Sequence, residues 1–256
     1  MTATLAPPAG ADVWLLRQPG PDSITGVLEM GELDEAELQR ARACRRQAGG
    51  YLYAAAHIAL RRVLSAYVGE PAKDLVFGRG PCPCCDLRHG RPMLVSPESD
   101  LHFSLSHSSG MVLIGVARVP IGVDVERTPS EETARVCAQA FHPEERAELA
   151  EVPACAGTSA FGRLWTRKEA YLKGLGTGLG RDLSLDYLGW ETEKHPEGWS
   201  VVDVPAGPRH TAAAAIGHDG SPQGPVILRW LPMESLYSGT RADLARRNSV
   251  LAELAA

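Results

Sequence analysis

The chain has 256 residues, of which 44% are hydrophobic, so it can bury a core as one large domain or as two of ordinary size. Its 26 basic and 31 acidic residues give a net charge of −5, which excludes nucleic acid as the main partner because no basic excess is left to neutralise a phosphate backbone. Residues 101–117, the longest stretch without Asp, Glu, Lys or Arg, are interrupted by His and Ser and do not form a membrane span, and the N-terminus lacks the basic residues of a signal peptide. We therefore expect a cytoplasmic protein without a membrane partner.

The first quarter of the chain predicts one strand and two helices. Residues 1–12 are rich in Ala and Pro and are expected to be a disordered lead-in, followed by a strand at residues 13–16. A helical pattern over residues 33–46 ends in a run of arginines, which by itself is typical of a solvated helix face. Gly49 and Gly50 are expected to separate this helix from a long apolar one over residues 51–67.

A cysteine-rich loop follows a short predicted strand at residues 75–78. Cys82 and Cys85 have the C-x-x-C spacing, and His89 could supply a third ligand for zinc. A structural zinc site needs four ligands, so reduced cysteines in a Pro-rich loop are the alternative. The sequence leaves both interpretations open.

A β-hairpin is predicted for residues 101–106 and 111–118, which alternate or run apolar around a turn of His, Ser and Gly. Ser106 and His107 then lie at a strand end, where they can donate hydrogen bonds to an anion. The alternative is a histidine that merely fills the turn.

Residues 121–126 predict a strand with two carboxylates on one face. With the period of two of a strand, Asp124 and Glu126 point to one side while Val123 and Val125 point to the other. Two such carboxylates repel unless a cation lies between them, and with a third carboxylate they suit Mg²⁺. An acidic pair that keeps an edge strand from aggregating is the alternative, although the apolar flanks favour burial.

After residue 126, the pattern predicts helices at residues 131–140 and 143–149. A loop at residues 157–160 is predicted to lead into a further helix. In that helix Trp165, Glu169 and Lys173 fall four apart on one face. A Glu and a Lys at this spacing are commonly a solvated ion pair.

Lys168 occupies the centre of an otherwise apolar stripe on the neighbouring face of this helix. A lysine in such a position must be paired, reach water with its ammonium, or face an anionic ligand.

The last quarter predicts mainly strands, at residues 187–190, 199–204, 210–216 and 226–230, and a polar helical tail from Arg241 to the end. A long helix followed by a few strands thus occurs twice, with the joint near residue 122. This order fits two similar halves, each a small sheet packed on a helix.

Four motifs in this order resemble those of a known enzyme family. Gly122-Val123-Asp124-Val125-Glu126 and Trp165-x-x-Lys168-Glu169-Ala170-x-x-Lys173 resemble the two signature motifs of the 4′-phosphopantetheinyl transferases, most of all the longer, surfactin-synthetase-activating (Sfp) type. The separation of 43 positions from Glu126 to Glu169 suits that type. Upstream, Gly90-Arg91-Pro92 and Ser106-His107 resemble its other two blocks, so that the similarity extends over residues 13–216.

The resemblance implies an α+β pseudo-dimer, each half of which is a small, mainly antiparallel sheet packed on a long helix. Residues 13–121 would form an N-terminal half that binds coenzyme A, and residues 122–256 a C-terminal half with the metal and the catalytic helix. The active site would lie between the halves, and a monomer would suffice.

The resemblance also implies a reaction. The 4′-phosphopantetheine arm of coenzyme A would pass to a serine of acyl, peptidyl or aryl carrier proteins, with release of 3′,5′-ADP, as in the activation of polyketide and nonribosomal peptide synthesis. The reaction would require Mg²⁺ or Mn²⁺ and convert the carrier from its apo to its holo form.

By position, three residues resemble the Mg²⁺ ligands of the family: Asp124, Glu126 and Glu169. Glu169 also resembles the base that takes the serine proton, and Lys173 resembles the lysine at the phosphates. Residues that match or lie nearest to the family's coenzyme A contacts are Arg46, Arg91, Ser106, His107 and Lys168.

Two further functions are compatible with the motifs. A Mg²⁺-dependent hydrolase of a nucleotide diphosphate would use the same metal and lysine without an acceptor protein. A non-enzymatic binding module would use the carboxylates only as structural groups.

Overall fold

The computed structural model describes residues 4–19, 25–85, 87–218, 224–239, 244 and 249–255. Its strands are β1 (Ala11–Arg17), β2 (Val76–Arg79), β3 (Pro92–Ser96), β4 (His102–Ser108), β5 (Met111–Ala117), β6 (Ile121–Arg127), β7 (Trp199–Asp203), β8 (His210–Gly217), β9 (Val226–Trp230) and β10 (Ser249–Leu254). Its α-helices are α1 (Glu35–Ala43), α2 (Gln47–Val68), α3 (Glu131–Cys137), α4 (Pro143–Glu151) and α5 (Ala154–Leu175). Short 3-10 turns occupy Met30–Glu32, Ala72–Asp74, Ala138–Ala140, Gly178–Gly180, Thr192–Lys194 and Met233–Leu236. The predicted α+β class is therefore confirmed.

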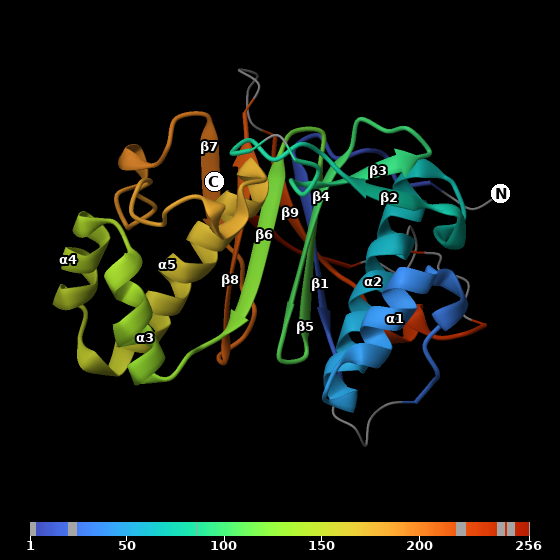
Figure 1. Cartoon of the computed structure of the whole chain (residues 1–256), viewed down its shortest axis with the longest axis horizontal. Helices are drawn as coiled ribbons and strands as arrows, with labels where there is room; N and C mark the ends of the chain where they lie inside the picture. Colours follow the sequence, from blue (N-terminus) through green and yellow to red (C-terminus); the bar gives the residue numbers. More distant parts are fainter. Residues whose placement is uncertain are drawn as a thin grey trace.

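Apart from the hairpin of β2 and β3, which lies beside the end of α2, the labelled strands lie between α1 and α2 on one side and α3, α4 and α5 on the other (Figure 1). The strands form a five-stranded sheet in the order β10-β9-β1-β5-β4, a three-stranded sheet in the order β6-β8-β7, and the separate hairpin β2-β3. Strand β1 runs antiparallel to β5 and parallel to β9, so strands from both ends of the chain share the larger sheet.

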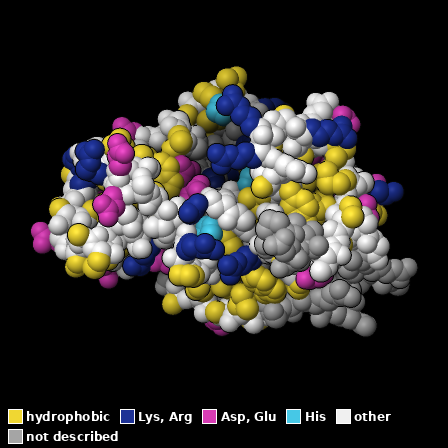
Figure 2. Space-filling view, turned by 90° about the horizontal axis from the view of Figure 1, so that it is seen from below, with side chains coloured by type: hydrophobic (Ala, Val, Ile, Leu, Met, Phe, Trp, Pro, Cys, Tyr) yellow, Lys and Arg dark blue, Asp and Glu magenta, His cyan; other side chains and the backbone are white. Residues whose placement is uncertain are grey.

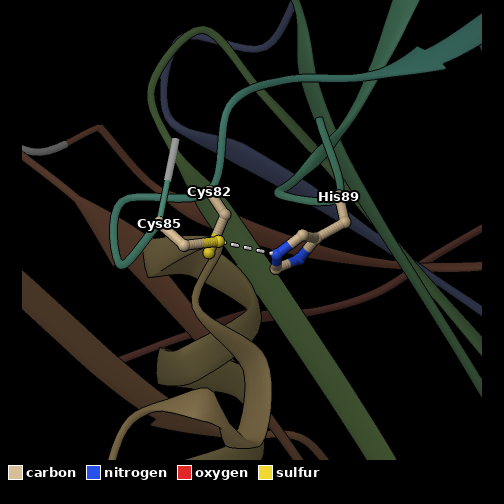
Figure 3. Close-up of side chains that lie close together, drawn as sticks. All are labelled: Cys82, Cys85 and His89. Atoms are coloured by element: carbon tan, nitrogen blue, oxygen red, sulfur yellow. Dashed lines mark hydrogen bonds between the residues drawn. The ribbon is translucent and has the colours of Figure 1, made fainter. Parts of the chain in front are cut away.

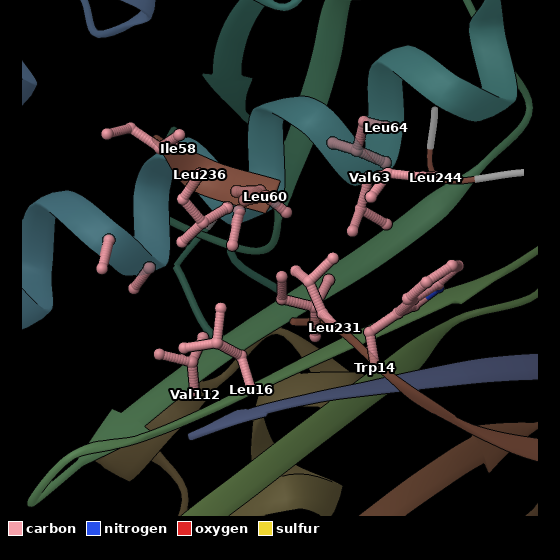
Figure 4. Close-up of a cluster of buried hydrophobic side chains, with 14 of the residues drawn as sticks. Trp14, Leu16, Ile58, Leu60, Val63, Leu64, Val112, Leu231, Leu236 and Leu244 are labelled. Carbon is pink, nitrogen blue, oxygen red and sulfur yellow. The ribbon is translucent and has the colours of Figure 1, made fainter. Parts of the chain in front are cut away.

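Helix α2 covers one face of the five-stranded sheet. Trp14, Leu16 and Val112 on the sheet meet Ile58 and Leu64 of the helix in a fully buried cluster (Figure 4). The alternation along β1 sends Val13 and Leu15 to the opposite face of the sheet. That face packs against the second sheet.

The second interface joins the two sheets and carries the strand with the acidic pair. Val123 and Val125 of β6 pack with Val13, Leu15 and their neighbours on β5 and β8. Helix α5 covers the outer face of the β6-β8-β7 sheet, where Ala170 and Leu172 meet Ala213 and Ala215. The layers are thus α2, the large sheet, the small sheet and α5, and α2 and α5 have 22 residues each.

Helix α2 begins at Gln47, four residues before the predicted start, because Gly49 and Gly50 belong to its first turn. A Cβ atom at Gly50 would lie 2.4 Å from the carbonyl oxygen of Ala41 in α1. The glycine therefore permits the close approach of two helices rather than separating them.

The predicted loop at residues 157–160 is wrong, since these residues lie inside α5. The helix begins directly after Pro153, and the small residues of its first turns are compatible with a helix. Packing against neighbouring helices and against the small sheet extends α5 well beyond the residues that show a clear helical pattern.

The predicted strand at residues 187–190 is also wrong, because side chains rather than a neighbouring strand satisfy its backbone. Glu145 Oε1 accepts the Leu188 N–H at 2.7 Å, and Arg167 Nη1 donates to the carbonyl oxygens of Leu188 and Gly189 at 3.3 and 2.8 Å. The segment is an irregular connection held by α4 and α5.

The predicted helical tail is wrong over residues 249–254, which form β10, while residues 241–243 and 245–248 lie outside the described part of the chain. Strand β10 pairs antiparallel with β9, and Ala252 and Leu254 pack on the core between the sheets. Tertiary pairing has overridden the helix propensity of Leu, Ala and Glu here. Among the described residues, we find no helix that is long and apolar enough to cross a membrane.

Candidate functional site

Three serines join the two sheets along the seam between β4 and β6. The alternation of β4 places the hydroxyls of Ser104, Ser106 and Ser108 on one side of the strand. They accept hydrogen bonds from successive inward N–H groups of β6, those of Val123, Val125 and Arg127, at 3.1, 3.3 and 3.4 Å. The acidic strand is thereby fixed beside β4 although no backbone ladder joins these two described strands.

The same serines orient the two carboxylates of β6. Ser106 Oγ donates to Asp124 Oδ1 at 2.8 Å, and Ser108 Oγ donates to Glu126 Oε2 at 2.7 Å. Asp124 is only 2% exposed, and its second oxygen, Oδ2, is buried without a hydrogen-bond partner among the described residues. Burial and, to a lesser degree, the nearby Asp124 carboxylate raise the pKa of Glu126 above its ordinary value.

Helix α5 brings Glu169 and Lys173 to this strand because Gly122 allows an unusually close approach. A Cβ atom at Gly122 would lie 1.9 Å from the carbonyl oxygen of Ala170. Lys173 Nζ lies 2.6 Å from Asp124 Oδ1 and donates to Ser106 Oγ at 3.1 Å. The lysine is thus engaged with the strand rather than with solvent alone.

Glu169 lies in the same negative environment. Burial raises the pKa of Glu169, and the charges of Asp124 and Glu126 raise it further, while Lys173 lowers it in part. Three carboxylates from β6 and α5 therefore share one charged lysine.

The donor set fits a hard divalent cation in its chemistry. Carboxylate oxygens are the ligands that Mg²⁺ prefers, and the unpartnered Asp124 Oδ2 and the raised pKa values of Glu126 and Glu169 all indicate negative charge that is not fully compensated. Within the described residues, the oxygens of the three carboxylates do not all lie within 4.8 Å of one another. Side-chain rotation would be needed to bring them onto a single ion.

A pocket of about 910 Å³ opens beside these residues, with Glu126, Lys173 and Ser106 in its wall. On the face shown in Figure 2, Lys, Arg and His side chains gather around a central hollow. The pocket is lined by the basic residues Arg40, Arg79, Arg88, Arg91 and Lys173 and by the histidines His57, His89 and His107, together with Asp34, Glu37 and Glu126. Such a wall suits an elongated anion with several phosphate groups.

Arg91, Ser106 and His107, predicted as contacts for an anion, all line this pocket. Arg91 Nη1 donates to the carbonyl oxygen of Gly174 at 3.0 Å and so ties the start of β3 to the end of α5. Burial lowers the pKa of His107, and His57 and Lys173 lower it further, so its ring is a neutral hydrogen-bonding group at neutral pH.

Arg46 lies outside the set of described residues that line the pocket. It is exposed at the N-terminal end of α2, where it precedes the first helical residue. Arg40, one helix earlier, lines the pocket instead.

Lys168 is buried behind the pocket wall, with 2% of its surface exposed. Its Nζ lies 2.8 Å from Glu145 Oε2 and donates to the carbonyl oxygens of Leu183 and Asp186 at 2.8 and 2.7 Å. The sequence left three roles open for this lysine: a paired ammonium, an ammonium that reaches water, or a contact with an anionic ligand. The structure shows the first, because the ammonium has a buried partner. Glu145, itself 0% exposed, is that partner.

The sequence interpretation overlooked Tyr53 and His57, which lie one turn apart on α2. Their rings stack at 4.2 Å, His107 meets Tyr53 edge-on at 6.0 Å, and His57 Nδ1 lies 2.9 Å from Glu37 Oε1. The signal was a histidine on an apolar helix four residues from a tyrosine. Ser104 and Ser108 were overlooked as well, although their spacing of two from Ser106 marked one face of the strand.

Glu126 also lines a second, smaller pocket of about 250 Å³. It is lined by Glu126, Arg127, Pro129, Thr133, Cys137, Phe161, Gly162 and Trp165. Glu126 therefore lines both a large basic pocket and a small, largely apolar one.

Comparison with known proteins agrees with this geometry. A sequence model of the 4′-phosphopantetheinyl transferase superfamily matches residues 120–214, the segment that contains β6 and α5. The 4′-phosphopantetheinyl transferase gsp of Aneurinibacillus migulanus is 30% identical over 120 residues, which cover 47% of this chain and 46% of that protein.

The 4′-phosphopantetheinyl transferase HetI of Nostoc sp. is 29% identical over 169 residues, covering 63% of this chain and 68% of HetI. The 4′-phosphopantetheinyl transferase Sfp of Bacillus subtilis is 30% identical over 118 residues, covering 46% of this chain and 50% of Sfp. The matched part of the chain thus spans about half the length of gsp and of Sfp. Over residues 120–214, this chain is similar to the 4′-phosphopantetheinyl transferase superfamily.

Proposed function

We propose that this protein transfers the 4′-phosphopantetheine arm of coenzyme A to a serine of acyl, peptidyl or aryl carrier proteins. The observation that carries the proposal is Lys173, whose ammonium bonds Asp124 and Ser106 at the wall of a basic pocket large enough for a nucleotide with several phosphates. The superfamily match over residues 120–214 supports the same reaction.

Coenzyme A would lie with its 3′-phosphate and adenosine among the arginines and histidines of the large pocket. Arg91 and Arg88 offer charge-assisted hydrogen bonds to phosphate oxygens, and the neutral ring of His107 offers one donor or acceptor. The diphosphate would then face Lys173, whose ammonium exchanges its contact with Asp124 for one with the phosphates as charge develops.

Glu169 would accept the proton of the carrier serine. In the metal-free protein, burial and two neighbouring carboxylates raise the pKa of Glu169. The serine oxygen forms a bond to the phosphorus that bears the pantetheine arm, and the bond from that phosphorus to 3′,5′-ADP breaks. Asp124, Glu126 and Glu169 would hold Mg²⁺ or Mn²⁺, which when bound supplies positive charge to the diphosphate.

The arrangement of layers supports a pseudo-dimer. Each large helix covers one sheet, so residues 13–121 and 122–256 are proposed as two similar halves, with β9 and β10 crossing over to the sheet of the first half. The site would lie between these halves, in a monomer that acts in the cytoplasm.

The small pocket that Glu126 also lines supports a position for the acceptor. Trp165 and Phe161 give it an apolar lining within reach of the carboxylates. A carrier protein that docks there would present its serine close to Glu126.

Replacement of Glu169 by Gln tests the proposal. Without the proton acceptor, the transfer rate should fall by about 100-fold or more, measured as the gain in carrier mass with coenzyme A and Mg²⁺. Glu151→Gln, at an exposed residue that ends α4, is the matched control and should transfer at the wild-type rate.

Two outcomes would contradict the proposal. A Glu169→Gln protein that keeps most of its transfer activity would remove the proposed base. Release of nucleotide from coenzyme A without any carrier, at a rate unaffected by adding one, would favour a hydrolase instead.

A further inference from the structure

The loop between β2 and β3 brings two cysteines together with His89, which lines the large pocket. The sulfurs of Cys82 and Cys85 and a ring nitrogen of His89 all lie within 4.8 Å of one another. Cys85 Sγ lies 2.9 Å from His89 Nε2, and the three side chains point toward a common centre (Figure 3). Elsewhere in the described chain, we find no other such group of three potential ligands.

The spacing of these atoms is close to that of a tetrahedral zinc site. Bond lengths of about 2.3 Å to sulfur and about 2.1 Å to nitrogen place two sulfurs about 3.8 Å apart, and a sulfur and a nitrogen about 3.6 Å apart. The observed 2.9 Å between Cys85 Sγ and His89 Nε2 would have to open by about 0.7 Å, which a small side-chain rotation provides.

The backbone around Cys82 forms a tight turn. Cys85 N donates to the Cys82 carbonyl oxygen at 3.3 Å, and both Cys82 N and His89 N donate to the carbonyl oxygen of Leu87 at 2.8 Å. These three hydrogen bonds fix the distance between the cysteine turn and the histidine before any ion is added.

The cysteines differ in their surroundings. Cys82 is 1% exposed, and the backbone N–H groups of Cys84 and Cys85 lie close enough to its sulfur to favour the thiolate. Oriented N–H groups of this kind offset the negative charge of a metal-bound thiolate. Cys84 is exposed and lies outside the group of three, so it is not needed as a ligand.

We propose that Cys82, Cys85 and His89 bind Zn²⁺, with solvent in the fourth position. Thiolate and imidazole ligands favour this ion over Mg²⁺, which prefers oxygen. Binding releases the protons of two thiols to solvent, and the two thiolates and the ion together carry no net charge. The site therefore leaves the positive field of the neighbouring pocket unchanged.

The ion would hold the loop that supplies one wall of the coenzyme A pocket. Arg88, His89, Gly90 and Arg91 all belong to this loop and line the pocket. Fixing Cys82 and Cys85 to His89 orders the two arginines before the ligand arrives, which lowers the entropy lost on binding. This role, unlike the metal site itself, rests on the proposed function.

Metal content of the purified, reduced full-length protein is the direct test. We expect about one zinc per chain, measured by plasma mass spectrometry, and a thiolate-to-metal absorption band when Co²⁺ replaces zinc. Cys85→Ser should lose both signals, whereas Cys84→Ser should keep both. Because a variant can misfold, wild-type protein stripped with a chelator and reloaded with zinc or Co²⁺ provides a second measurement.

Three results would overturn the metal site: wild-type protein that takes up no zinc after reduction, equal zinc in Cys85→Ser, or loss of zinc in a folded Cys84→Ser protein. A stable Cys82–Cys85 disulfide in freshly purified protein, with no zinc after reduction, would show a redox pair instead.

Zinc removal should raise the KM for coenzyme A about tenfold while kcat changes little, since loss of charged hydrogen bonds weakens binding by this order. Zinc that binds with no effect on KM would overturn the role in the pocket but not the site. Zinc that binds to a protein that modifies no carrier would leave the site intact and count against the proposed function.

Discussion

Replacement of Gly122 by alanine should separate the two elements that carry the site. The added Cβ would lie 1.9 Å from the carbonyl oxygen of Ala170, and real Cβ atoms essentially never come closer than 3.0 Å to such an atom. Strand β6 and helix α5 must therefore move apart by about 1.1 Å. Overpacking of this kind lowers the free energy of unfolding by about 1–3 kcal/mol.

The same movement should impair transfer. Lys173 Nζ lies 2.6 Å from Asp124 Oδ1, so a shift of this size would stretch the contact beyond a hydrogen bond. A misplacement of about 1 Å among catalytic groups reduces the rate by about 100-fold. We expect Gly122→Ala to show both effects, in urea unfolding followed by circular dichroism and in transfer kinetics followed by carrier mass.

Gly157→Ala is the matched control on α5. Nothing lies within 4 Å of the Cβ that this substitution adds, so alanine should raise the free energy of unfolding by about 0.4–1 kcal/mol through its helix propensity. If Gly122→Ala were as stable and as active as the wild-type protein, the reasoning from close approach would be refuted. The same would hold if both alanine variants were destabilised equally.

Two further substitutions test the buried charges by urea unfolding. Lys168→Met leaves the fully buried Glu145 without its cation and should lower the free energy of unfolding by about 3–5 kcal/mol. Adding Glu145→Gln to the same chain should restore part of this loss. A Lys168→Met protein as stable as the wild type would contradict the ion pair. Burial alone would raise the pKa of Glu37, but a hydrogen bond with His57 and the charge of Arg61 outweigh it and hold the pKa below 4.5. Since the unfolded chain then takes up the proton first, the stabilisation by Glu37 is complete above pH 4.5 and is lost as the pH falls through the folded-state pKa. Glu37→Gln should therefore be less stable than the wild-type protein at neutral pH, by a difference that shrinks below pH 4.5, and a constant difference would be evidence against this linkage.

The parts of the fold that the sequence predicted are those in which local pattern and tertiary structure agree. The alternation of residues 121–126 correctly predicted that the valines and the carboxylates lie on opposite faces of β6, because the valine face packs against the larger sheet. The hairpin of β4 and β5 followed from the same period and a short polar turn.

The parts of the fold that the sequence did not predict depend on contacts between residues far apart in the chain, which a local sequence pattern does not reveal. Residues 187–190 read as a strand because they are apolar, yet Glu145 and Arg167 provide their hydrogen bonds from distant helices. Residues 249–254 became a strand because the edge of β9 was available. In the candidate site, Lys168 belonged to a signature motif, but only the fold shows that its partner is Glu145.

The pocket illustrates the same limit. Arg91, Ser106 and His107 could be identified by their motifs, whereas Arg40 and His57 could not, because the packing of α1 on α2 brings them to the pocket wall. The sequence therefore predicted the residues of β6 and α5 that lie together better than the pocket wall beside them.

The mass of carrier proteins after incubation with the purified protein, coenzyme A and Mg²⁺ tests the central claim most directly. A panel of acyl, peptidyl and aryl carriers should be used, with the metal omitted in parallel. We predict a gain of about 340 Da on at least one carrier, the mass of the transferred arm, together with 3′,5′-ADP in equal amount and no gain without metal. If no carrier in the panel gained mass with either Mg²⁺ or Mn²⁺ present, the proposed transfer reaction would be contradicted.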